Sequence, residues 1–177
     1  SPSGLGGALV ELSSGDDQTF DFTAAPWLAN LTIYAEEPQG AITNGGQIRI
    51  SVPAAWACRF DTEAAVTFSS NAQEKVGAPL YSDDGRSLII PVIEDFTDDD
   101  ALEIAGLRLL DLRLVSPDTQ SLELDFDGDG NRDVYDQYAI TVRAVWSGGS
   151  YDGWDCLAME EASDLRWAIK TTVISIR

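Results

Sequence analysis

The chain contains no histidine, only two lysines and few cations of any kind. Histidine is the commonest general base and the commonest transition-metal ligand, so its absence excludes Ser-His-Asp and Cys-His catalysis. Eleven basic residues face thirty acidic ones, which gives a formal charge of −19 at pH 7. A phosphate backbone or an anionic membrane surface needs a positive face, so we expect neither nucleic acid nor such a membrane as a partner.

Long apolar runs are also missing, because no stretch of the 177 residues is long and apolar enough to cross a bilayer. Hydrophobic residues still make up 44% of the chain, which is enough for a well-buried core. We expect a single folded domain over residues 16–177, preceded by a flexible arm over residues 1–15. Paired carboxylates could hydrolyse glycosides, but no cleft motif singles out a pair, so we expect no enzyme.

Cysteine is scarce as well, with only Cys58 and Cys156 far apart in the sequence. An even number of cysteines in an acidic, loop-rich chain favours one disulfide between them. Such a bridge would place the protein in an oxidising location, outside the cell or on its surface. Two buried free thiols are the alternative.

Alternation of apolar and polar residues is the dominant pattern of the chain, and it predicts β-strands. Turn sequences such as Thr-Asn-Gly-Gly at 43–46 separate ten short segments of this kind. The expected strands are residues 8–12, 18–22, 30–36, 47–52, 64–70, 87–92, 107–115, 121–126, 137–146 and 168–176. This spacing predicts an all-β protein, an antiparallel β-sandwich of about nine or ten strands. Residues 155–168 are the one candidate for a short helix.

Residues 125–136 concentrate five aspartates in twelve positions, with Gly130 at the sixth, where a calcium loop turns sharply. The carboxylates fall at positions 1, 3, 5, 9 and 12, and a backbone carbonyl is available at position 7. We therefore predict a calcium site whose ligands are Asp125, Asp127, Asp129, Asn131 through its carbonyl, Asp133 and Asp136. Position 12 usually carries a longer glutamate. A solvated acidic turn is the alternative.

The segments on both sides of this stretch have strand patterns, so the loop resembles the calcium loops of secreted dockerin modules and thrombospondin-like repeats. Residues 44–53, 82–92 and 101–109 repeat a rhythm of glycine turn, strand and proline. This rhythm resembles immunoglobulin-like β-sandwich domains of bacterial and archaeal surfaces, including cohesin-like, surface-layer and filament-forming domains. The resemblance implies an immunoglobulin-like or jelly-roll-type sandwich that serves as a secreted or surface structural module, often stabilised by calcium.

The function we expect first is a secreted, calcium-stabilised subunit of an extracellular filament or surface layer. Such a subunit would assemble with copies of itself as a homo-oligomer or polymer. The short apolar segment around Leu9, Val10 and Leu12 would act as a donor strand that adds to a neighbour's open sheet edge. In the alternative, this segment is the first strand of its own sandwich.

A carbohydrate-binding or adhesive module of a larger extracellular protein is the second expected function. Residues 146–154 carry aromatic side chains in a glycine-rich segment. Trp146, Tyr151 and Trp154 would form the platform on which a sugar stacks. Packing of these side chains in a core or an interface is the alternative.

Overall fold

The structure is a computed structural model, and it describes residues 9–82 and 84–144. The chain divides into two compact units, residues 1–143 and 144–177, and the second lies outside the described residues apart from Ala144. The described residues form fourteen strands and two short 3₁₀ turns, with no α-helix among them. No helix in this part of the chain is therefore long and apolar enough to cross a membrane.

A four-stranded antiparallel sheet forms one layer of the fold. Its order is β1 (Leu9–Ser13), β3 (Leu31–Glu37), β9 (Asp100–Ala105) and β6 (Thr67–Ser69). Burial alternates along its strands, as the sequence pattern predicts for a sheet with one face turned inward. In the central strand β3, Leu31, Ile33 and Ala35 are fully buried while the residues between them are half-buried.

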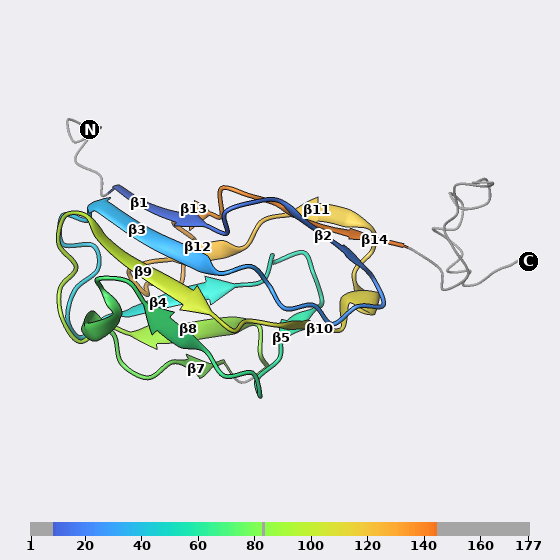
Figure 1. The fold of residues 1–177 in the computed structure, drawn as a ribbon, viewed down its shortest axis with the longest axis horizontal. Helices are drawn as coiled ribbons and strands as arrows, with labels where there is room; N and C mark the ends of the chain where they lie inside the picture. The colour runs from blue at the N-terminus through green and yellow to red at the C-terminus, as the bar shows by residue number, and fades with distance from the viewer. Residues whose placement is uncertain (1–8, 83, 145–177) are drawn as a thin grey trace, which may run out of the picture. The chain divides into compact units, whose positions relative to one another are not determined.

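A five-stranded antiparallel sheet forms the second layer. Its order is β13 (Val134–Tyr135), β12 (Glu123–Asp125), β4 (Gln47–Ser51), β8 (Ser87–Pro91) and β7 (Leu80–Tyr81). The buried side chains of both sheets belong to one hydrophobic core. Figure 1 shows the strands of the two layers running past one another. The fold is thus the β-sandwich that the sequence predicts.

Two smaller sheets complete the described part of the chain. A three-stranded sheet has the order β11 (Asp118–Gln120), β14 (Ile140–Arg143) and β2 (Gln18–Asp21). Its β14–β2 pair is parallel, which departs from the purely antiparallel sandwich that we expected. Strands β10 (Leu109–Leu110) and β5 (Arg59–Phe60) form a two-stranded ribbon.

The edges of the two large sheets meet on one side of the sandwich. Leu12 of β1 forms a parallel bridge with Asp136, just after β13, and the Gln137 N–H donates to the Leu12 carbonyl over 2.9 Å. This seam joins the two layers. The other two edge strands are β6 and β7.

Strand β1 contains the segment that we expected to act as a donor arm. In the structure it pairs with β3 of its own chain, from Leu9 to Ser13. Val10 and Leu12 of this strand are only 3% and 1% exposed. Donation to a neighbour would require β1 to leave this place, so the donor role stays a prediction. Residues 1–8 of the expected arm lie outside the described residues.

Candidate metal centre

The aspartate-rich stretch forms the loop between the adjacent strands β12 and β13. These strands pair through Glu123 with Tyr135 and Leu124 with Val134, and the Asp133 N–H donates to the Leu124 carbonyl over 2.8 Å. Strand β12 also pairs with β4 on its other side. The loop is therefore fastened at both ends to the five-stranded sheet.

Four of the five aspartates come together in this loop. Asp125, Asp127, Asp129 and Asp133 each offer a carboxylate oxygen, and these oxygens all lie within 4.8 Å of one another. Asp125 is only 5% exposed, whereas the other three carboxylates are exposed. Four carboxylate oxygens this close together, one of them on a buried residue, are an arrangement that a hard cation can occupy.

Backbone N–H groups hold the carboxylates in place. The two oxygens of Asp125 accept hydrogen bonds from the N–H groups of Gly128 and Gly130, each over 2.8 Å. Both glycines have positive φ, 73° and 92°, which turns the chain back over Asp125. Asp133 accepts from the Phe126 N–H over 2.9 Å, which ties the two ends of the loop together.

None of the ion pairs formed by the described residues involves these four carboxylates. Arg132 lies inside the loop, but its guanidinium sits over the ring of Tyr135, 4.2 Å from the ring centroid. The repulsion within the cluster is therefore not balanced by a neighbouring basic side chain. Partners of this kind would otherwise compete with a metal for the oxygens.

Proton affinities within the cluster reflect this crowding. Loss of solvent, together with a hydrogen bond to Asp125 and the charges of Asp133 and Asp129, raises the pKa of Asp127 to about 6. Loss of solvent and neighbouring charges also raise the pKa of Asp133. The Asn131 N–H, which donates to Asp129 over 2.8 Å, lowers the pKa of that carboxyl instead. The carboxylates therefore share their negative charge unequally.

Asp136, expected at position 12 of the loop, is not part of this cluster. Its N–H donates to the Leu122 carbonyl, which places it beside the first part of the β12 segment rather than at the loop. Its Oδ1 accepts hydrogen bonds from the N–H groups of Ser14 and Tyr138 over 2.9 and 3.1 Å. The sequence spacing thus identified four carboxylates of the cluster and added a fifth that lies elsewhere. The role of the Asn131 carbonyl stays a prediction.

The remaining predicted site residues fall largely outside the described part of the chain. Trp146, Tyr151, Trp154 and the helix candidate at 155–168 all lie there. Cys58 is buried and forms no disulfide with a described residue, and burial raises the pKa of its thiol to about 11 against the opposing effect of Arg86. Its expected partner, Cys156, is outside the described residues, so the disulfide stays a prediction.

A second acidic run, residues 94–103, contains an ion pair that the sequence did not predict. Lys75 donates to Asp100 over 2.8 Å and to the Asp95 carbonyl over 3.1 Å, and the Thr97 N–H donates to Asp100 over 2.7 Å. Burial acts to raise the pKa of Asp100, but the hydrogen bonds from Lys75 and Thr97 together outweigh it, so the pKa is lowered. The bonds fasten the loop before β9 to the 3₁₀ turn Gln73–Lys75, so this part of the run has a structural partner.

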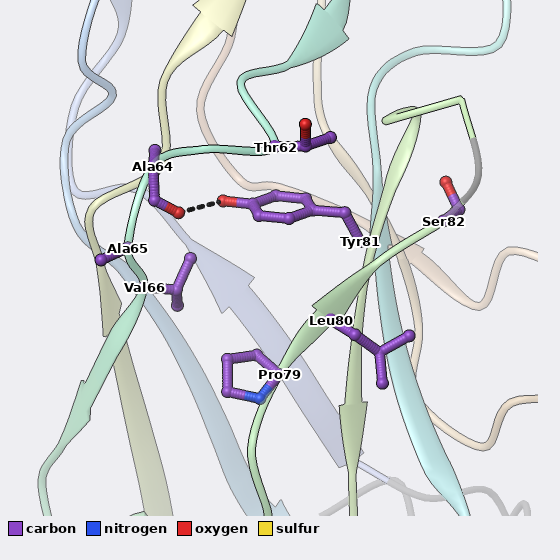
Figure 2. Close-up of a pocket in the computed structure, with 8 residues that line it drawn as sticks. All are labelled: Thr62, Ala64, Ala65, Val66, Pro79, Leu80, Tyr81 and Ser82. Carbon is purple, nitrogen blue, oxygen red and sulfur yellow. Dashed lines mark hydrogen bonds between the residues drawn. The ribbon is translucent and has the colours of Figure 1, made fainter.

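An open pocket of about 670 Å³ lies between the segment that precedes β6 and the edge strand β7. Figure 2 shows Tyr81 reaching across it, and its hydroxyl donates to the Ala64 carbonyl over 3.0 Å. Small apolar and hydroxyl side chains, among them Val66 and Leu80, line the rest. Among the described residues that line the pocket, none carries a formal charge and none is a predicted site residue.

Comparisons of the chain with protein-family models and with curated proteins find no match. The fold and the carboxylate cluster therefore define the class of the protein: an all-β sandwich with a loop that could hold a metal ion.

Proposed function

We propose that the protein is a structural β-sandwich module that calcium stabilises through the loop between β12 and β13. The observation that carries this proposal is the group of four carboxylates within 4.8 Å of one another without a basic partner. Carboxylate and carbonyl oxygens suit hard cations, and calcium accepts irregular sets of six to eight oxygens better than magnesium does. Water would supply the ligands that the chain does not.

The position of the loop supports a structural role for the ion. Asp125 ends β12 and Asp133 precedes β13, so a bound ion would fix the pairing of these two strands. Because β12 also pairs with β4, the effect would extend into the five-stranded sheet. Neutralising the cluster also removes a local repulsion from a chain of charge −19.

The wider setting that we propose is a secreted subunit of an extracellular filament or surface layer, with an immunoglobulin-like sandwich as its body. The acidic charge, the calcium loop and the strand rhythm support this setting. The more specific proposal is that subunits assemble by donating β1 to a neighbour. For this, β1 has to leave its pairing with β3 of its own chain. Carbohydrate binding rests on aromatic residues outside the described part of the chain, so the structure adds nothing to it.

Thermal unfolding with and without calcium tests the stabilising role. A ligand at a hundred times its Kd stabilises the native state by about 2.7 kcal/mol. For a chain of this size that corresponds to a rise of about 5–10 °C in Tm. We expect this rise for the wild-type chain on adding CaCl₂, and its reversal by a chelator.

The variant Asp127→Asn with Asp129→Asn should remove the part of the calcium response that comes from this loop. Loss of two charges can stabilise so acidic a chain by itself, so a charge-matched control is needed. Glu94→Gln with Asp98→Asn removes two exposed charges for whose side chains the structure gives no hydrogen bond or ion pair, and it should keep the full response. An equal Tm in calcium and in chelator for the wild-type chain would reject the proposal.

A further inference from the structure

Asp136 is a buried carboxylate with an oxygen that has no partner. The residue is 3% exposed, and its Oδ2 is buried without any hydrogen bond. No ion pair of the described residues includes it. Burying a charged oxygen without compensation is costly, so native structures normally pair such a group or let it coordinate a metal.

The junction around Asp136 contains several oxygen atoms, and it also contains Gln18, whose Nε2 is the other buried side-chain polar atom of the described residues without a hydrogen bond. Its Oδ1 accepts the Ser14 and Tyr138 N–H groups, which places the carboxylate between the β1–β2 turn and residues 136–139. Ser14 is also buried, at 5% exposure. Its Oγ makes one hydrogen bond, to the Asp16 carbonyl, and at 3.4 Å that bond is long for a hydroxyl donor. The hydroxyl therefore keeps a lone pair free for another partner.

The same turn is fastened to the far segment by a further carboxylate. Asp17 accepts a hydrogen bond from the Ala139 N–H over 2.9 Å, and the Gln18 N–H donates to the Ala139 carbonyl over 2.9 Å. Asp16 and Asp17 are both exposed residues at this junction. The oxygens at the junction thus come from carboxylate, hydroxyl and carbonyl groups, which are the ligands of hard cations.

We propose that this junction is a second cation site, separate from the loop between β12 and β13. Asp136 Oδ2 anchors a hard cation, Na⁺ or Ca²⁺, and Ser14 Oγ and the Asp16 carbonyl are the neighbouring ligands. The ion compensates the buried charge of Asp136. It also clamps the end of β1 to residues 136–139, across the seam that joins the two layers of the sandwich.

Two measurements on the full chain test this site. Native mass spectrometry in CaCl₂ counts the calcium ions bound to the chain. Sodium binding is detected by comparing the Tm in chelator plus NaCl with the Tm in chelator plus choline chloride at the same concentration, which keeps the ionic strength constant. Asp136→Asn keeps the acceptor for the Ser14 N–H but removes the charge, and Asp98→Asn removes one exposed charge as the control. We expect the control to behave like the wild type, and Asp136→Asn to lose one calcium ion or the sodium-dependent rise in Tm.

The outcome does not depend on the first site. The variant Asp127→Asn with Asp129→Asn should keep whichever response Asp136→Asn loses. The inference is wrong if Asp136→Asn folds and matches the Asp98→Asn control in both measurements, which is the result expected when Gln18 Nε2 or a water satisfies Oδ2.

A second variant covers the case in which Asp136→Asn does not fold. Ser14→Ala removes the hydroxyl ligand and keeps the backbone N–H that Asp136 accepts. It should weaken the cation response at least several-fold in apparent affinity. An unchanged response in a folded Ser14→Ala protein would then overturn the inference.

Discussion

Asp127 is the residue at which metal binding and pH are coupled. Its pKa in the metal-free fold is raised to about 6 from 3.8, so the folded chain binds this proton more tightly than the unfolded chain does. The contribution of this carboxyl to stability is therefore greatest at low pH and falls as the pH rises from about 4 to about 6. A metal that needs the ionised carboxylate has to displace the proton.

We therefore expect the apparent calcium affinity to be constant above about pH 7 and to fall at least about tenfold per unit below about pH 6, since one proton or more is released on binding. The raised pKa of Asp133 steepens this dependence. Calorimetric titration of CaCl₂ at a series of pH values measures it. An affinity that stays constant down to pH 5 would contradict the coupling, and Asp127→Asn should bind more weakly with a shallower slope.

At the scale of elements, the loop between β12 and β13 depends on a close contact with the neighbouring strand β4. Gly128 has φ of 73°, and a Cβ at this position would lie 2.7 Å from the Gln47 carbonyl oxygen. Gly130 has a similar φ of 92°, but a Cβ there would meet nothing within 4 Å. Comparing the same substitution at the two glycines therefore distinguishes the free energy lost to the backbone conformation from the free energy lost to the contact with Gln47.

Gly128→Ala should be clearly more destabilising than Gly130→Ala. In both variants an alanine has to adopt the left-handed backbone conformation, which costs about 1–2 kcal/mol of stability. Only Gly128→Ala also displaces the loop from β4, which adds about 1–3 kcal/mol and moves the ligands apart. Denaturant unfolding and calcium titration of both variants measure the difference. Equal losses of stability and affinity would mean that the contact with Gln47 does not position the loop.

The sequence pattern predicted several of the longer strands well because each of them turns one face to the core. Strands β3, β4 and β8 fall within a residue or so of the expected ranges. The expected strand 107–115 is instead interrupted at Asp111, whose φ of 66° breaks the extended backbone. Two-residue strands such as β5 and β7 are too short to carry an alternating pattern.

Strand β9 and Asp136 show why other parts could not be predicted. The strand begins inside an acidic run, and the buried Asp100 pairs there with Lys75, which is distant in the sequence. Asp136 stands at the twelfth position of the loop pattern, where a calcium ligand is expected. Sequence spacing alone, however, does not show whether the chain stays at the loop up to that position. Here β13 leads the chain away from the loop along β12, so the residue reaches the seam with β1.

At the scale of the whole molecule, β1 closes the core of its own sandwich. Val10 and Leu12 are both buried in the core that the two large sheets share. Full burial of such side chains contributes about 1.5–3 kcal/mol each. Their sum is a large part of the total stability of a domain, which is about 5–15 kcal/mol.

Deleting residues 1–13 should therefore unfold the protein, whereas deleting residues 1–8 should leave the fold of the remaining chain intact. Circular dichroism and size-exclusion chromatography of both truncations show the result. A chain without residues 1–13 that stays folded and monomeric, while the full chain assembles, would instead support strand donation to a neighbour.

The central claim is that four carboxylates between β12 and β13 hold a calcium ion. A crystal structure grown in CaCl₂, with anomalous differences recorded to locate calcium, tests it most directly. We expect one ion at about 2.3–2.6 Å from oxygens of Asp125, Asp127, Asp129 and Asp133. A well-ordered loop with its carboxylates turned to solvent and no ion between them, at millimolar calcium, would contradict the claim.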